Sequence, residues 1–174
     1  MDHDLKLFTD YWKNARGRTL RVLDVLPEAE LEWSYAPGRF TFGDLFRHLA
    51  GIERYMFAEN ALRRPSRYPG HSVELASGLA GVREYMERCH REALEIFGSL
   101  GPQDLEARCV TPGGLPITVW KWLRSMVEHE AHHRGQLYLM ASMRGLPVPP
   151  LYGLTEEEVK ARSVVEEEVS PKTS

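Results

Sequence analysis

Cysteine is scarce in this chain of 174 residues, which contains only Cys89 and Cys109. Two cysteines are too few for the disulfide framework on which small secreted domains depend. No apolar run approaches the roughly 18 residues that a membrane-spanning helix needs. The first four residues, Met-Asp-His-Asp, also lack the basic flank that precedes the apolar stretch of a signal peptide. We therefore expect a cytoplasmic protein with no membrane partner.

Glycine and proline are not abundant either, with 14 and 11 residues, which excludes a fibrous or low-complexity chain. Apolar residues make up 43% of the sequence and charged residues 27%, as in a globular protein. A chain of this length suits one domain that buries roughly 70% of its unfolded surface.

Excess positive charge is absent, since the formal net charge is −3. Residues 151–174 contain six glutamates and three basic residues, whereas residues 1–150 hold 19 basic and 19 acidic residues. A neutral body without a basic stripe is not typical of a nucleic-acid-binding protein, so we expect no nucleic-acid partner. The sequence predicts a domain over residues 1–153 and an acidic tail over residues 154–174.

Helical periodicity dominates the sequence. Apolar residues recur at helical spacing in four segments, at about residues 5–26, 42–62, 73–97 and 119–144. Four helices of about 20 residues in one short domain predict an all-α fold, a four-helix bundle. The connection between the second and third segments is long enough for a hairpin or a crossover, so the pattern leaves the topology open.

Capping residues and turn residues predict where these helices begin and end. Thr41, with Asp44 three residues later, predicts the start of the second helix, and Ser72 and Thr118 predict the starts of the third and fourth. Gly145 predicts the end of the fourth. Between the third and fourth helices we expect an irregular insert or short hairpin, with strands at residues 108–110 and 115–117. A short helix at residues 155–165 and a frayed end from Glu166 complete the prediction.

Histidine occupies positions where a bundle helix normally carries leucine. On the fourth helix the apolar stripe is interrupted in its middle by His129 and His133, and on the second helix by His48. Residues four apart on a helix differ in direction by only about 40°, so His129 and His133 can bind one ion, with His48 as a third ligand. Three protein ligands would leave coordination positions open for water or substrate. The alternative is that the three are core histidines with hydrogen-bond partners and no metal.

The remaining four histidines are not predicted to bind the metal. The direction of His132 differs by about 60° from that of His129, on the side opposite to His133. We therefore expect His132 at the rim of the site or behind a ligand. His71 and His90 are expected at the surface, and His3 in a loose terminus.

Residues 129–133, His-Glu-Ala-His-His, also match the short HExxH pattern of zinc proteases, in which Glu130 would be the general base. The extended form of that pattern fails, because Gln136 and Leu139 stand where its glycine and third histidine would be. Little β structure is predicted to hold an extended peptide, so we rank a protease below the other readings.

Three segments resemble the DinB/YfiT-like family: residues 42–53 (FGDLFRHLAGIE), 129–136 (HEAHHRGQ) and 145–153 (GLPVPPLYG). The resemblance covers about residues 5–153. It implies a four-helix bundle with up-down-down-up order, often a homodimer, and a divalent metal on His48, His129 and His133. It implies neither polymerase activity nor DNA binding. Some relatives are thiol-dependent transferases or isomerases, and others are treated as hydrolases.

The leading hypothesis is therefore a metal-dependent enzyme that activates a low-molecular-weight thiol or water for reaction with a small molecule. Zinc or nickel is the leading metal, with iron or copper as alternatives. A second hypothesis is a non-catalytic, dimeric metal- or ligand-binding module. In that case His90, Cys109 or a tail glutamate would close the fourth coordination position.

Several neighbouring residues are candidates for supporting roles. Glu130 and Gln136 could orient a ligand or a bound water, although Glu130 could equally be a solvated helix charge. Candidates for contact with substrate are the aromatic residues and the arginine that lie near the predicted site, namely Tyr11, Trp12, Tyr55 and Arg134. The aromatic residues could instead belong to the core, and Arg134 could form an intersubunit pair.

Overall fold

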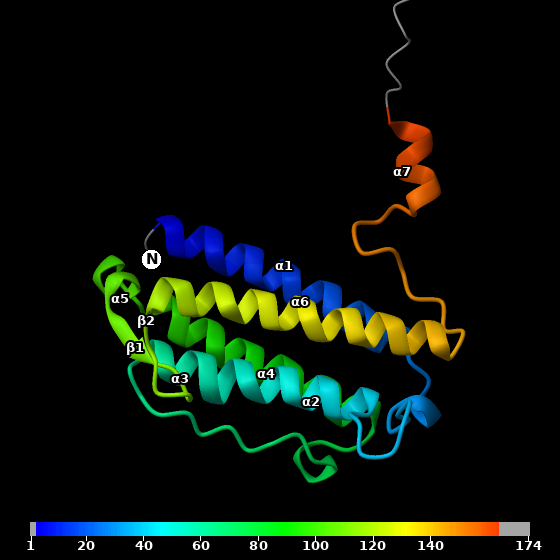
Figure 1. Cartoon of the computed structure of the whole chain (residues 1–174), viewed down its shortest axis with the longest axis horizontal. Helices are drawn as coiled ribbons and strands as arrows, with labels where there is room; N and C mark the ends of the chain where they lie inside the picture. The colour runs from blue at the N-terminus through cyan, green and yellow to red at the C-terminus, as the bar shows by residue number, and fades with distance from the viewer. Residues whose placement is uncertain (1–2, 164–174) are drawn as a thin grey trace, which may run out of the picture.

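The computed structural model describes residues 3–163 as a four-helix bundle (Figure 1), which confirms the predicted fold class. The first helix is α1 (His3–Val25). The second predicted helix is a continuous series made of α2 (Phe42–Ile52), the π-helical turn η2 (Glu53–Phe57) and α3 (Ala58–Ala61). The other two long helices are α4 (Gly78–Gly98) and α6 (Val119–Met143).

Side-chain contacts give the direction of each helix. Phe8, near the start of α1, packs against Phe97 at the end of α4 and Trp120 at the start of α6. Phe57, after α2, packs against Trp122, so α2 runs opposite to α6. The order is therefore up-down-down-up, as the family resemblance implies. The connection between α3 and α4 crosses the length of the bundle (Figure 1), and a hairpin at this point is excluded.

The core consists of two apolar clusters with a polar layer between them. One cluster contains the buried apolar residues of the first half of α1, such as Leu5 and Trp12, and of the start of α6, such as Leu123. The other contains Val22 and Leu23 of α1 with Leu137, Met140 and Ala141 of α6. Between them the bundle buries charged and polar side chains, among them Arg16, Thr19, Glu53, Glu130, His133 and Arg134. This layer is where the candidate functional residues lie.

The predicted helix starts are confirmed at two of three positions. Thr41 and Asp44 form a reciprocal capping box at α2, with N–H···O distances of 2.9 and 3.0 Å. Thr118 accepts a hydrogen bond from the backbone of Lys121 and caps α6. The prediction at Ser72 is wrong for the long helix, because only the 3-10 turn η3 (Val73–Leu75) follows it. Ala76 then adopts extended backbone, and α4 begins after Ser77.

The insert before α6 contains the predicted hairpin. Its strands are β1 (Arg108–Val110) and β2 (Pro116–Thr118), which pair antiparallel, and the second lies one residue later than predicted. A short helix, α5 (Pro102–Glu106), precedes it, and a 3-10 turn, η1 (Glu28–Glu30), follows α1. Neither had been predicted.

The chain leaves the bundle after α6. Gly145 adopts the positive φ of +66° expected at the end of that helix. The tail forms α7 (Glu156–Arg162), which has no buried residue, so the predicted tail helix is present but shorter. The predicted fraying from Glu166 lies outside the described residues. Within residues 3–163, no helix is both long enough and apolar enough to cross a bilayer.

Candidate metal centre

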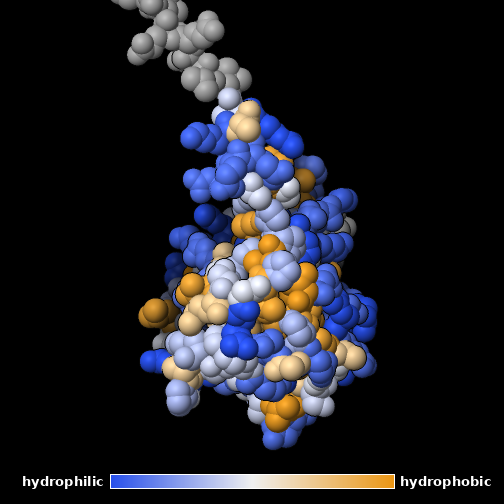
Figure 2. Space-filling view, turned by 90° about the vertical axis from the view of Figure 1, so that its right-hand side faces the viewer, coloured by the Kyte–Doolittle hydropathy of each residue, from blue (hydrophilic) through white to orange (hydrophobic). Residues whose placement is uncertain are grey.

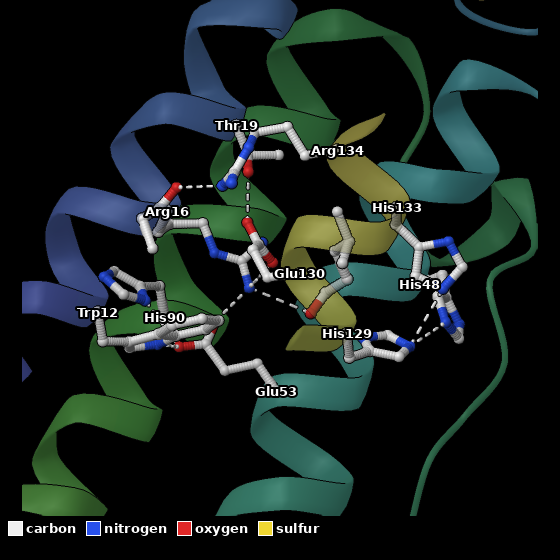
Figure 3. A network of polar contacts seen from close by, with 12 residues as sticks. Trp12, Arg16, Thr19, His48, Glu53, His90, His129, Glu130, His133 and Arg134 are labelled. Atoms are coloured by element: carbon white, nitrogen blue, oxygen red, sulfur yellow. Dashed lines mark hydrogen bonds and ion pairs between the residues drawn. The ribbon is translucent and has the colours of Figure 1, made fainter. Parts of the chain in front are cut away.

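Two antiparallel helices bring the predicted ligands together. His48 lies near the middle of α2, and His129 and His133 lie one turn apart on α6. Nε2 of His129 is 3.1 Å from Nε2 of His48 and 3.1 Å from Nε2 of His133. The ligand-capable atoms of all three side chains lie within 4.8 Å of one another (Figure 3). Two nitrogen ligands that each lie about 2.1 Å from one ion are about 3.0 Å apart at a 90° angle and about 3.4 Å apart at the tetrahedral angle, so the spacing fits a shared ion.

Hydrogen bonds to the outer ring nitrogens determine which atoms face inward. Nδ1 of His133 is 2.7 Å from Oε1 of Gln136. An amide oxygen only accepts, so Nδ1 donates, and neutral His133 presents the lone pair of Nε2 to the other two rings. Nδ1 of His48 is 2.7 Å from the hydroxyl of Tyr68. Hydrogen bonds among the rings cannot satisfy several converging lone pairs, whereas a cation can.

Burial keeps these imidazoles neutral. Loss of solvent, with a smaller contribution from the neighbouring imidazoles, lowers the pKa of His48 to about 4 and that of His129 to about 3. Burial also lowers the pKa of His133, which is 8% exposed. Neutral imidazole is the form that binds metal ions, so the cluster is in its ligating form at neutral pH.

Residues 11–137 match the family model of the DinB superfamily. The chain belongs to the DinB superfamily. The match includes α2, α4 and most of α6, and therefore all three histidines.

Solved structures of DinB-like proteins share this fold. A DinB-like protein from Bacillus cereus is 22% identical, with a TM-score of 0.69 over 82% of this chain and 94% of its own. The DinB-like protein YjoA from Bacillus subtilis is 15% identical, with a TM-score of 0.70 over 86% of this chain and 99% of its own. YfiT from Bacillus subtilis is 15% identical, with a TM-score of 0.68 over 84% and 91%. YfiT is described as a probable metal-dependent hydrolase with an unusual four-helix bundle topology. No curated protein sequence matches the chain.

Aromatic side chains that the sequence analysis did not single out surround the three histidines of this DinB-superfamily chain. The ring of Phe40 stacks on His48 at 5.5 Å and meets His133 edge-on at 6.2 Å. Phe57 lies 5.9 Å from the ring of His129. His71 is half-buried, not at the surface as predicted, because its ring packs against Phe40 at 4.6 Å. These rings cover part of the cluster and contribute to its burial.

Glu130 points away from the histidines, toward α1 (Figure 3). Its carboxylate is 1% exposed, accepts a hydrogen bond of 2.5 Å from the hydroxyl of Thr19 and lies 3.4 Å from the guanidinium of Arg16. The surface-charge interpretation of Glu130 is therefore wrong, because Arg16 and Thr19 stabilise it in the interior. Its contacts also disfavour the protease reading, in which this carboxylate would face the ligands.

Arg16 connects Glu130 to a second buried carboxylate. Its guanidinium donates to Glu53 at 2.6 Å and to the backbone oxygen of Leu49 at 3.2 Å. His90 also binds Glu53, with Nδ1 2.7 Å from its carboxylate. The prediction of a surface position for His90 is wrong, since its side chain is only 16% exposed and this acidic partner holds it inward.

The pKa values of the two carboxylates beside Arg16 are shifted in opposite directions. Burial alone would raise the pKa of Glu53, but Arg16 and His90 outweigh burial and lower it. For Glu130, burial prevails over Arg16 and Thr19, so its pKa is raised. Sequence reasoning missed Arg16 and Glu53 because charged residues normally face solvent, and nothing in their spacing indicates otherwise.

The four residues suggested for substrate contact do not surround the histidines. Trp12 is 1% exposed and donates to Glu53, so it belongs to the core. Tyr11 is on the outside of α1 beside Arg18, and Tyr55 packs beside Arg54.

Arg134 is also buried and donates to the backbone oxygen of Ala15 at 3.2 Å, so its guanidinium lies inside the bundle and not in an open cleft. Gln136, by contrast, does contact a predicted ligand, through Nδ1 of His133.

Proposed function

We propose that this chain is a metal-dependent enzyme that holds one divalent ion on His48, His129 and His133. The observation that carries the proposal is the convergence of three Nε2 atoms, two pairs of them 3.1 Å apart, in a half-buried cluster of neutral imidazoles. All-nitrogen ligation suits zinc or nickel first, with iron or copper as alternatives.

The proposed chemistry is activation of water or of a thiol. When bound, a divalent ion would supply Lewis acidity that lowers the pKa of either group, for zinc-bound water to about 7. Tyr68 and Gln136 would hold two ligand rings through their Nδ1 atoms, and Phe40 would limit entry of bulk water. A hydrolase or a thiol-dependent transferase or isomerase fits this arrangement, and the description of YfiT supports the first.

A non-catalytic metal- or ligand-binding module is the second candidate, and it would require a closed coordination shell. Within residues 3–163 the group of metal-capable side chains contains these three histidines. His90 is bound to Glu53, Cys109 is buried in the hairpin, and Glu156–Glu158 lie on the exposed helix α7. These positions favour an open site, and thus the enzyme.

Elemental analysis of protein purified without added metal tests the site. We expect about one equivalent of metal per chain in the wild type and a loss of most of it in His48→Ala and His133→Ala. His132→Ala is the matched control, because His132 is exposed on the same turn of α6. Equal metal content in the wild type and the ligand variants would overturn the proposal. Activity of metal-loaded protein in a screen of hydrolysable esters, amides and thiol cosubstrates would separate the enzyme from the module.

We also propose a cytoplasmic location, a small-molecule substrate with a low-molecular-weight thiol as the candidate cosubstrate, and a homodimer, with no nucleic-acid or membrane partner. Light scattering of the purified protein would test the dimer, with a mass of about twice 19.9 kDa as the expected result.

A further inference from the structure

A cavity of about 390 Å³ lies beside the candidate metal centre, at the end of the bundle where α6 ends. Its volume falls in the range of small-molecule sites. Apolar side chains form most of its lining, namely Tyr35, Phe40, Leu45, Leu139, Met140 and Met143. Figure 2 shows apolar side chains exposed among polar ones at this end of the molecule.

Two residues of the lining also contact the candidate ligands. Gln136 lines the cavity and accepts from Nδ1 of His133. Phe40 lines it too, and its ring lies 5.5 Å from the ring of His48. A molecule in the cavity is therefore separated from the histidines by one aromatic ring and one amide side chain.

One charged residue, Arg39, is part of the lining. Within residues 3–163 its guanidinium group forms no hydrogen bond or ion pair, unlike the nearby Arg47 and Arg144, which pair with glutamates. No acidic side chain lines the cavity to offset it. An apolar cavity with one unpaired cation complements a molecule that has an apolar body and one acidic group.

We propose that this cavity binds the apolar part of an anionic small molecule, that Arg39 pairs with its carboxylate or sulfonate, and that this molecule is the substrate. The last clause rests on the proposed function, whereas the binding site itself does not. The uncharged part of the molecule packs on Leu139 and Met143, which are 63% and 57% exposed at the cavity. Its reactive group faces Phe40 and Gln136, the two lining residues that contact the candidate ligands.

Two fluorescent probes of nearly equal shape test the binding. 8-Anilinonaphthalene-1-sulfonate carries one negative charge, and N-phenyl-1-naphthylamine has the same rings without it. We expect both to bind metal-free protein with one site per chain. Arg39→Gln should weaken the sulfonate probe about three- to tenfold and leave the uncharged probe unchanged.

Variants locate the site. Leu139 is 63% exposed at the cavity, so Leu139→Glu should weaken both probes without loss of fold. Matched controls are Arg124→Gln and Leu7→Glu, which change exposed residues elsewhere and should bind both probes as the wild type does. Equal sulfonate affinity in the wild type and Arg39→Gln would overturn the proposal. So would loss of probe binding as the protein concentration rises, because a second copy of the chain would then cover this face.

Probe fluorescence with and without bound metal distinguishes failure of the cavity proposal from failure of the proposed function. Probe fluorescence should be lower in Co²⁺-loaded than in Zn²⁺-loaded protein, because a paramagnetic ion quenches a nearby fluorophore. Equal fluorescence in the two loaded forms would overturn the claim that the cavity adjoins the reactive centre. A wild type without metal would refute the proposed function, yet probe binding by metal-free protein would still be measured independently.

Discussion

In two of the three candidate ligands, the ring nitrogen that faces away from the cluster forms a hydrogen bond with an uncharged side chain. Gln136 fixes the ring of His133, and Tyr68 fixes that of His48, each through Nδ1 at 2.7 Å. The hydroxyl of Tyr68 is also 3.4 Å from Nδ1 of His71, which can accept a hydrogen bond from it. With His48 donating to Tyr68 and Tyr68 donating to His71, the lone pair of His48 Nε2 faces the other imidazoles.

Replacing Tyr68 by phenylalanine should weaken metal binding about 10- to 100-fold, because His48 loses the contact that fixes its ring and tautomer. The affinity is measured by competition with a chelator of known strength. Tyr138→Phe is the matched control, since it removes a hydroxyl hydrogen bond of 3.0 Å to the backbone of Pro149. Both variants should lose about 1 kcal/mol of stability, but only Tyr68→Phe should lose affinity. Wild-type affinity in Tyr68→Phe would show that the hydroxyl does not position His48.

The two positioning residues differ in how well the sequence predicts them. Gln136 follows His133 by three residues on one helix, so helical geometry alone places it near the ring. Tyr68 lies in the irregular connection between α3 and α4, and its contact with His48 spans 20 residues. No local pattern determines where such a connection runs, and the crossover itself was left open by the sequence.

One guanidinium joins the four long helices of the bundle. Arg16 of α1 contacts the end of α2 through Leu49, the π-helical turn η2 through Glu53, and α6 through Glu130. Glu53 in turn binds His90 of α4. Two side-chain nitrogens of Arg16 have no hydrogen-bond partner within the described structure. The layer is therefore sensitive to the loss of Glu53, the carboxylate that pairs most closely with this guanidinium.

Glu53→Gln and Glu130→Gln should differ in their effect on the free energy of unfolding. Glu53 is the main ion partner of Arg16 and also accepts from Trp12, so its loss leaves a buried charge poorly compensated and should destabilise by about 3–5 kcal/mol. Glu130 has a raised pKa and keeps an acceptor for Thr19 as glutamine, so its replacement should cost about 1 kcal/mol. Denaturant unfolding at pH 7 measures both, and equal losses would contradict this division.

The stabilities of the Glu53→Gln and Glu130→Gln variants, each relative to the wild type, should change in opposite directions with pH. The raised pKa of Glu130 adds stability below its ordinary value of 4.5, and this is lost as the pH rises through the folded value. The lowered pKa of Glu53 adds stability above 4.5, and this is lost as the pH falls. Relative to the wild type, Glu130→Gln should therefore improve as the pH rises from 4.5, and Glu53→Gln should improve as it falls below 4.5. Parallel pH profiles of the two variants would contradict the assignment.

Element boundaries show where local sequence is sufficient. The caps at Thr41 and Thr118 were predictable because each satisfies backbone donors within its own first turn. The inward direction of Glu130 was not, since a glutamate beside a ligand histidine is compatible with several helix faces. The presence of Arg16 and Thr19, more than 100 positions earlier in the chain, decides among them.

The body of the protein is formally neutral, and the net charge of −3 comes from residues 151–174. The bundle and the segment that follows α6 are joined by a few contacts. Arg21 donates to the backbone oxygen of Leu151 at 2.9 Å, and Tyr138 donates to that of Pro149. Leu146 and Val148 pack on the second apolar cluster. These contacts end before the predicted domain boundary at residue 153.

A chain truncated after residue 153 should therefore unfold within about 2 °C of the full chain, because the described residues of α7 bury nothing. Its metal content should be unchanged, and its isoelectric point should rise as six glutamates leave with three basic residues. Truncation after residue 144 is the contrasting variant. It removes two side-chain hydrogen bonds worth about 1 kcal/mol each, the backbone bonds that Gly145 and Leu146 donate to the end of α6, and the packing of Leu146 and Val148. Its Tm should therefore fall by at least about 5 °C. If both truncations lowered the Tm equally, residues beyond 153 would belong to the folded domain, and the boundary at 153 would be wrong.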